Sequence, residues 1–119
     1  PDGTGLVYAT YVGGQSSDVG LAVGVDGAGN VYASGLTFSL NFPTTNGALR
    51  RTPGSSDPNE FENGDCFLFK LSAAGNGLQY STYLGGQRPD FCSALVVDRA
   101  GAVTIAGATA SRWSRRSRA

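Results

Sequence analysis

Aspartates are the side chains whose number and spacing suggest chemistry in this chain. The chain has 119 residues, of which nine are acidic and none is histidine. The absence of histidine excludes the commonest general base, the Ser-His-Asp and Cys-His arrangements and most zinc sites. Asp18 and Asp90 follow Gly-Gly pairs at the same distance, and Asp26 and Asp98 each open a glycine-containing turn. Paired carboxylates can act in acid–base catalysis. Aspartates at matching places in two similar segments instead predict a structural role, accepting hydrogen bonds from turn amides.

Signals for metals, phosphates and sugars are weak. Calcium-binding repeats place Asp and Gly at close, regular spacing, and Asp26-Gly-Ala-Gly-Asn30 matches that pattern only in part. The glycine pairs do not lie between a strand and a helix, so no phosphate-binding loop is indicated. Four recurring tyrosines favour packing between sheets over a sugar-stacking platform: Tyr8, Tyr11, Tyr80 and Tyr83. The sequence therefore predicts no catalytic residue, no cofactor or cofactor-binding residue and no metal ligand.

Two cysteines leave two interpretations open. Cys66 and Cys92 are 26 residues apart and form no CxxC motif. We expect them on different strands of neighbouring sheets, where they would form a disulfide in an oxidising compartment. The alternative, which we favour, is a pair of small buried apolar residues. Two cysteines alone do not establish the redox compartment.

Composition indicates an all-β protein. Glycine contributes 18 residues, about twice the usual share, which predicts many turns and few long helices. Val, Tyr, Thr and Phe occur in short runs that are typical of strands. The formal net charge is zero, so the chain as a whole has no electrostatic attraction to nucleic acid or acidic lipid. No apolar run is long enough for a membrane span, and no signal peptide is present.

An internal repeat determines the predicted architecture. A shift of 72 residues aligns Gly3–Thr37 with Gly75–Thr109 without gaps, and 18 of the 35 aligned positions are identical. Similarity kept in register over this length indicates a duplication. The identical pairs include Leu6/Leu78, Tyr8/Tyr80, Tyr11/Tyr83, Gly13/Gly85, Gly14/Gly86, Asp18/Asp90, Asp26/Asp98 and Gly35/Gly107.

Each repeat resolves into short strands. Residues 6–12 and 78–84 alternate apolar and polar side chains with period two. Residues 21–25 and 94–97 are nearly continuous apolar runs, which predicts strands covered on both faces. Residues 66–71 place Phe67, Phe69 and Leu71 on one face and Cys66 and Leu68 on the other. The predicted strands are Leu6–Val12, Leu21–Val25, Val31–Gly35, Cys66–Leu71, Leu78–Leu84, Ala94–Val97 and Val103–Gly107.

Four short antiparallel strands per period predict a β-propeller. A four-stranded unit with apolar side chains on both faces must stack between copies of itself, and propellers arrange such units radially as blades. A two-sheet sandwich is the structural rival, but its strands should alternate apolar-in and polar-out. We expect one complete blade, with residues 21–25 innermost and 78–84 outermost, flanked by parts of two others. The repeat fragment then covers residues 1–109, beginning in a turn-like Pro-Asp-Gly as a fragment would.

Four linked motifs resemble the SBBP family, the β-propeller repeats of large bacterial surface and secreted proteins. They are Leu78-Gln-Tyr-Ser-Thr-Tyr-Leu-Gly-Gly86, the hairpin of residues 25–35, Asn41-Phe-Pro-Thr-Thr45 and Gly64-Asp-Cys-Phe-Leu-Phe-Lys-Leu71. The resemblance covers residues 3–109. It implies a propeller blade with a binding or structural role and a secreted or cell-surface location, and it implies no catalytic residues.

Two segments depart from the repeat. Residues 38–64 form a long connection. We expect Phe42-Pro43 and Leu49 to pack its first half against the blade, and residues 52–64 to be mobile. Long loops are often functional, but a solvated insertion is favoured over an acidic recognition loop or a weak cation site built from Asp57, Glu60 and Glu62. Residues 110–119 hold four of the nine basic residues and Trp113. A disordered, truncated end of a longer array is favoured over a nucleic-acid or membrane site.

The favoured function is a non-enzymatic structural or binding module of a surface propeller. Its expected partners are neighbouring blades or other copies of the chain, and a protein or carbohydrate ligand held by its loops. The alternative is part of a propeller enzyme whose active site lies outside this chain; Arg99, which replaces Gly27 of the first repeat, is the nearest candidate for a channel residue. A third hypothesis is a partial product without independent function, whose strand edges invite pairing with other copies.

Overall fold

The computed structural model describes residues 2–54, 64–86 and 90–110. Within these ranges the chain is all-β, with no helix and with six strands in two antiparallel sheets. The strands are β1 (Asp18–Val25), β2 (Val31–Thr37), β3 (Asp65–Leu71), β4 (Leu78–Leu84), β5 (Asp90–Val97) and β6 (Val103–Thr109).

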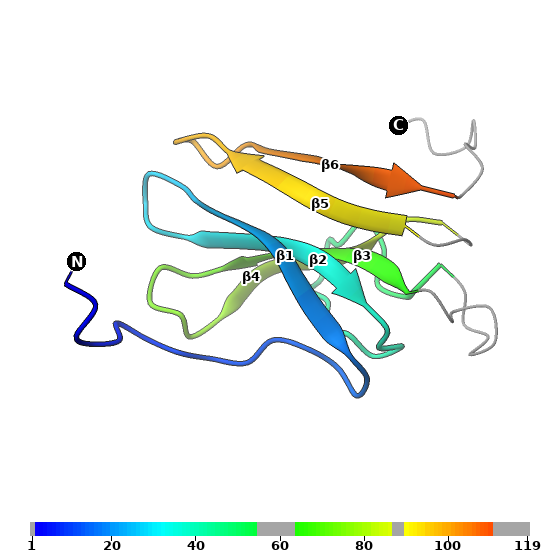
Figure 1. Ribbon diagram of the computed structural model, residues 1–119, viewed down its shortest axis with the longest axis horizontal. Helices are drawn as coiled ribbons and strands as arrows, with labels where there is room; N and C mark the ends of the chain where they lie inside the picture. Colours follow the sequence, from blue (N-terminus) through cyan, green and yellow to red (C-terminus); the bar gives the residue numbers. More distant parts are fainter. Residues whose placement is uncertain (1, 55–63, 87–89, 111–119) are drawn as a thin grey trace.

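The first sheet contains four strands in the order in which they occur in the chain, β1-β2-β3-β4 (Figure 1). Each pair is antiparallel, and a bulge between Gly20 and Ala22 interrupts the register of β1 with β2. The hairpin turn between these two strands contains Gly29, whose φ of 87° lies in the left-handed region that favours glycine. Short turns therefore account for the β1–β2 and β3–β4 pairs, whereas β2 and β3 pair across the long connection of residues 38–64.

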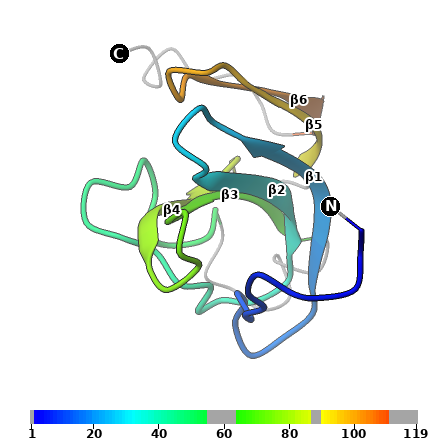
Figure 2. The ribbon, with the colours of Figure 1, turned by 90° about the vertical axis from the view of Figure 1, so that its left-hand side faces the viewer.

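The second sheet is the β5–β6 hairpin, which lies on one face of the first sheet (Figures 1 and 2). Its strand β5 runs over β1, β2 and part of β3. Gly24 lies close to the hairpin, because a methyl group built on its Cα would stand 2.8 Å from Val97 and 2.9 Å from Leu95. The Gly27 amide donates to the Arg99 carbonyl at 3.0 Å, which joins the two hairpin turns. The arrangement is two sheets packed face to face.

Six of the seven predicted strands are confirmed, and Leu6–Val12 is wrong. Residues 6–14 form an extended segment without strand pairing. Their repeat counterpart, β4, pairs with β3, which precedes it in the chain. The alternating pattern therefore identified a segment able to pair, but none of the described strands pairs with it.

The prediction that both apolar runs are covered on both faces is also wrong. In β1, Val23 is 68 % exposed and Val25 is 56 % exposed, because β5 covers only the opposite face of this strand. In β5, Val96 is 67 % exposed on the face turned away from the first sheet. Each run therefore has one packed face and one open apolar face.

The main core lies on the face of the first sheet that is turned away from β5. Phe42 stacks on Phe67 with ring centroids 4.6 Å apart, and Tyr83 meets Phe42 edge-on. The Tyr83 hydroxyl donates to the Ser39 carbonyl at 2.6 Å and accepts from the Phe42 amide at 2.8 Å. The long loop is thereby fixed to β4 by a fully buried phenol.

The recurring tyrosines differ in their environments. Tyr83 is fully buried and packs as predicted, whereas its counterpart Tyr11 is fully exposed, so the packing prediction is wrong for Tyr11. Tyr8 and Tyr80 are half-buried, and the Tyr8 ring lies against Gly75. Tyr83 is buried because residues 39–42 fold over it. Tyr11 lacks an equivalent cover among the described residues.

The long loop matches its prediction in part. Phe42 is buried and anchors the loop, whereas Leu49 is 74 % exposed and does not. Asp57, Glu60 and Glu62 lie outside the described residues, as does most of the expected basic tail, including Trp113.

Cys66 and Cys92 form a disulfide, so the favoured interpretation of two free buried thiols is wrong. Cys66 lies on the face of β3 that is turned toward the second sheet, and β5 brings Cys92 to it with a Cα–Cα distance of 5.5 Å. Both residues are buried. The disulfide links the two sheets covalently.

Replacing Tyr83 by phenylalanine should lower stability by about 1–3 kcal/mol, because the buried Ser39 carbonyl and Phe42 amide lose their partner. Urea unfolding followed by fluorescence measures the change. Tyr11→Phe is the matched control, since this counterpart is fully exposed, and it should change stability by less than about 0.5 kcal/mol. Equal effects of the two substitutions would contradict the assigned role of the Tyr83 hydroxyl.

Removing the disulfide should cost about 3–4 kcal/mol, the loop-closure value for a link across 26 residues. The test compares urea midpoints of the native chain with and without a reductant. The double variant Cys66→Ser/Cys92→Ser serves as the control and should unfold at the same midpoint in both conditions. If reductant leaves the native midpoint unchanged, the disulfide does not stabilise the packing of the two sheets.

Candidate functional site

The Asp18 carboxylate links the Gly-Gly turn of the first repeat to the end of β2 by hydrogen bonds, an arrangement that we call a bracket. Its Oδ2 accepts from the Gly14 amide at 2.9 Å and from the Ser39 hydroxyl at 3.2 Å, and its Oδ1 accepts from the Thr37 hydroxyl at 2.5 Å. One carboxylate thus joins the segment before β1, the end of β2 and the start of the long loop. The predicted role in capping turn amides is confirmed for Asp18.

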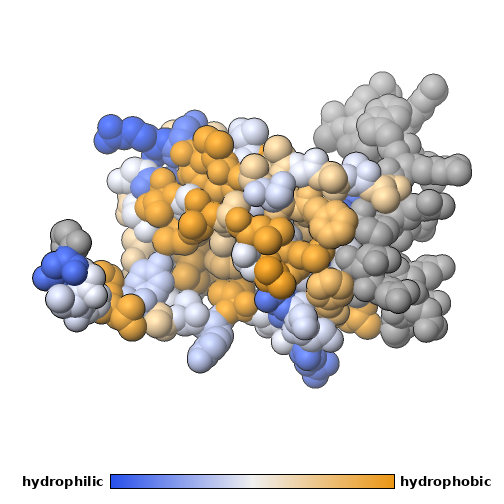
Figure 3. Space-filling view, viewed as in Figure 1, coloured by the Kyte–Doolittle hydropathy of each residue, from blue (hydrophilic) through white to orange (hydrophobic). Residues whose placement is uncertain are grey.

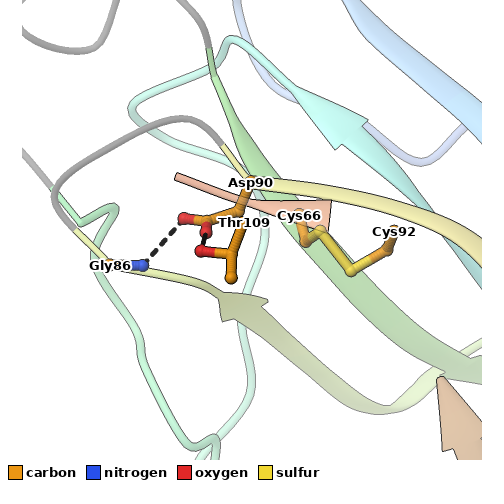
Figure 4. The surroundings of a disulfide bond; sticks show 5 residues. All are labelled: Cys66, Gly86, Asp90, Cys92 and Thr109. Carbon is orange, nitrogen blue, oxygen red and sulfur yellow. Dashed lines mark hydrogen bonds between the residues drawn. A yellow bond between two sulfur atoms is a disulfide. The ribbon is translucent and has the colours of Figure 1, made fainter. Parts of the chain in front are cut away.

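Asp90 repeats this bracket in the second repeat (Figure 4). Its Oδ2 accepts from the Gly86 amide at 2.8 Å, and its Oδ1 accepts from the Thr109 hydroxyl. The buried carboxylate lies beside the disulfide that holds Cys92 on the same strand. Because both brackets bond the same backbone and threonine positions, they are structural features of the repeat.

The two hairpin aspartates are also occupied by their own turns. Asp26 accepts from the amides of Ala28 and Asn30 and from the Asn30 and Tyr32 side chains. The Asn30 side chain is the largest cause of the lowered pKa of Asp26, which falls to about 2. Asp98 accepts from the Ala102 amide at 2.8 Å. The predicted structural role is confirmed for both residues.

Asp65 is the carboxyl group with the most perturbed proton affinity. It is 2 % exposed at the start of β3, and its Oδ2 accepts from the Gly54 amide at 2.6 Å. Burial raises the pKa of Asp65 to about 6, and the charge of Asp90 acts in the same direction, while the Gly54 amide and Arg50 oppose it. The sequence did not single out Asp65, because nothing local signals that the long loop returns to bury it.

Among the described residues, these carboxylates do not gather into a metal-binding group. Over residues 2–54, 64–86 and 90–110, no group of three or more Cys, Asp or Glu side chains is placed to hold a metal ion. The described part of the chain also contains no helix long and apolar enough to cross a membrane. The repeated aspartates are engaged in hydrogen bonds to the backbone and to neighbouring side chains. Their arrangement supports structural roles.

The long loop supplies an ordered surface that has no counterpart in the repeat. Residues 44–51 run along the outer edge of β4, where the Thr45 amide donates to the Ser81 carbonyl and the Tyr83 amide donates to the Arg50 carbonyl, each at 3.0 Å. The Ser81 amide returns a bond to the Thr45 hydroxyl at 2.9 Å. These bonds fix the loop backbone against the sheet.

We call the exposed part of this loop the Arg51 surface, formed by Thr44, Asn46, Leu49 and Arg51. The Arg51 guanidinium donates from Nη1 to Asn46 Oδ1 at 3.0 Å and from Nε to Thr44 Oγ1 at 3.4 Å. Two of its five N–H groups are thus used, and the side chain remains exposed beside the exposed Leu49. A guanidinium held in one orientation suits a carboxylate ligand. The sequence indicated specificity in this loop but not which residues carry it.

The opposite pKa shifts of Asp65 and Asp26 predict opposite effects of pH. The folded pKa of Asp65 is raised from 3.8 to about 6, so its contribution to stability declines as pH rises from about 4 to about 6. Asp65→Asn should therefore be more stable than the native chain at pH 7, by about 1–2 kcal/mol after solvent screening. Urea unfolding between pH 4 and pH 7 measures this difference.

Asp26→Asn is the contrasting variant. The folded pKa of Asp26 is lowered from 3.8 to about 2, so its contribution is present above pH 4 and is lost as pH falls toward 2. This variant should be less stable than the native chain at pH 7. Between pH 4 and pH 6 its free energy of unfolding should change with pH as steeply as that of the native chain. If the free energy of unfolding of the native chain does not change with pH in that interval, Asp65 is not buried in its neutral form.

Comparison with known proteins adds no relative to these observations. A scan against protein-family models finds no match for the chain, and a search of curated proteins finds none. Inferences about function therefore depend on the fold, the repeated brackets and the Arg51 surface.

Proposed function

We propose that this chain is a non-enzymatic structural or binding module from the repeat array of a secreted or cell-surface bacterial β-propeller protein of the SBBP type. In this reading β1–β4 form one blade, with β1 innermost, and β5–β6 form the inner half of the next. The neighbouring blades are its structural partners. A protein or carbohydrate ligand binds at its loops.

The observation that carries the proposal is that both sheets have apolar side chains on both faces. A sandwich would enclose its core between the sheets and present polar outer faces. Here the Phe42–Phe67–Tyr83 core lies outside the sheet-to-sheet interface, and Val23 and Val96 are exposed on the two opposite outer faces. Such sheets are suited to stacking in a series, which supports propeller blades over a sandwich.

The disulfide supports a secreted or cell-surface location. Disulfides form and persist in oxidising compartments and are rare in the cytosol of most organisms. Cys66 and Cys92 are bonded and buried between the sheets, so the link is structural.

The Arg51 surface supports ligand binding without catalysis. It offers a cation held by two acceptors next to an exposed apolar side chain, a combination that suits a carboxylate-bearing ligand such as a uronic acid or an acidic protein side chain. The repeated aspartates are placed at turns, and Asp65 is buried and accepts from the Gly54 amide. The described residues therefore favour recognition.

A binding assay tests this proposal. The full chain is titrated with oligosaccharides containing uronic acids, with their neutral counterparts and with acidic extracellular proteins, and the products are examined for cleavage. One ligand class should bind unaltered, and Arg51→Ala should weaken binding by roughly tenfold, the value of one charge-assisted contact. Arg99→Ala, an exposed arginine in the β5–β6 turn, is the matched control. Turnover of a ligand, or equal loss in the two variants, would overturn the proposal.

A further inference from the structure

The outer face of the β5–β6 hairpin is apolar and exposed. Leu95 and Val97 point toward the first sheet, so Ala94 and Val96 point away from it. A bulge between Cys92 and Ala94 shifts the alternation by one residue, so Cys92 also points inward and Phe91 points outward, and the β6 partners of the outward residues share their face. These outward residues carry no charge, and all are exposed: Phe91, Ala94, Val96, Thr104, Ala106 and Ala108. We call this set the outer face of the hairpin.

A second open apolar surface lies on β1. Val23 and Val25 are exposed on the side of the first sheet that is turned away from β5. Beside them is a hollow of about 370 Å³ between residues 8–12 and the sheet. Val12 covers the core at the far side of this hollow. We call Val23, Val25 and the adjoining wall of the hollow the open face of β1; Figure 3 shows apolar side chains gathered over β1 and β5.

The repeat relates these two surfaces to an interface that the chain already makes. A shift of 72 residues carries Ala22 and Gly24 of β1 onto Ala94 and Val96 of the outer face. In the first repeat, Gly24 contacts the hairpin. The outer face of the hairpin is therefore a second version of the β1 surface that packs against β5.

The same shift applies in the opposite direction. Leu95 and Val97, which pack against Gly24, are carried back onto Val23 and Val25. The open face of β1 is thus a second version of the β5 surface that packs against the first sheet. One chain exposes both complementary halves, and both are continuous with the interface between its two sheets.

From this we propose that the chain associates head to tail with further copies of itself, the outer face of the hairpin of one copy packing on the open face of β1 of the next. In this contact Val96 of one copy takes the place of Gly24 and meets Val23 and Val25 of the other. Val23 is smaller than Leu95, which provides part of the space that Val96 needs. The hairpin also fills the hollow beside residues 8–12.

A backbone hydrogen bond between hairpin turns fixes how the two copies align in this contact. Within the chain, the Gly27 amide donates to the Arg99 carbonyl at 3.0 Å. The equivalent bond between copies joins the Arg99 amide of one chain to the Gly27 carbonyl of the next. The two surfaces differ, so the interface is heterologous and can continue as a ring or a filament. The inference rests on the packing of the two sheets and does not depend on the Arg51 surface.

Two charge-introducing variants test the interface. The native chain should sediment as a concentration-dependent oligomer, whereas Val96→Asp and Val23→Asp should each weaken self-association by roughly tenfold or more, because each places a carboxylate against apolar side chains. Val96→Asp retains an intact open face and Val23→Asp an intact outer face. An equimolar mixture should therefore form a dimer with one copy of each variant, and this dimer should not grow further.

Leu49→Asp is the matched control, since Leu49 is equally exposed but lies on the Arg51 surface. It should assemble like the native chain, while the two interface variants should bind ligand like the native chain, so that failure of one proposal is distinguishable from failure of the other. A native chain that stays monomeric at all concentrations would overturn the inference. So would equal dissociation of Leu49→Asp, or a mixture of the interface variants that forms no dimer.

Discussion

The packing of β5 on the first sheet is the contact on which the rest of this structure depends. A two-stranded hairpin is marginally stable by itself, so β5 and β6 need the surface that β1–β3 provide. A side chain at Gly24 would meet the ends of the Leu95 and Val97 side chains, so this close approach depends on glycine or on a shift of those two side chains. It also sets the position of Cys92 over Cys66 and of the two hairpin turns against each other. Substitutions at Gly24 would consequently disturb the interface, the disulfide and the second repeat together.

The two repeats share their brackets but differ in what covers them. Asp18 and Asp90 bond the same backbone and threonine positions, which fixes the entry of each repeat into its first strand. The tyrosine that follows the same pattern is buried at position 83 and exposed at position 11. The duplicated sequence therefore specifies the local turns in both repeats. The burial of the repeated tyrosine depends instead on which other segments pack over it.

Much of the fold could be predicted from the sequence, because alternation and glycine turns are local signals. Six strands and the roles of the repeated aspartates follow from such signals. Alternation in residues 6–12 could not reveal that none of the described strands pairs with them. A separation of 26 residues could not show that β5 crosses β3 at Cys66. The burial of Asp65 and the hydrogen bonds that orient Arg51 depend on how the long loop returns to the sheet. No local sequence pattern encodes this path.

The disulfide has a consequence for how the chain responds to mechanical force. Cys66 and Cys92 enclose β4, the Gly-Gly turn and the start of β5 in a covalent loop. When the chain is stretched from its two ends, tension passes through the sulfur atoms and bypasses this loop. The enclosed residues cannot be drawn out while the link is intact, so the extensible length of the repeat is shortened by the loop. The edge of β4 thus lies outside the load path, whereas the Arg51 surface precedes Cys66 in the chain and stays within it.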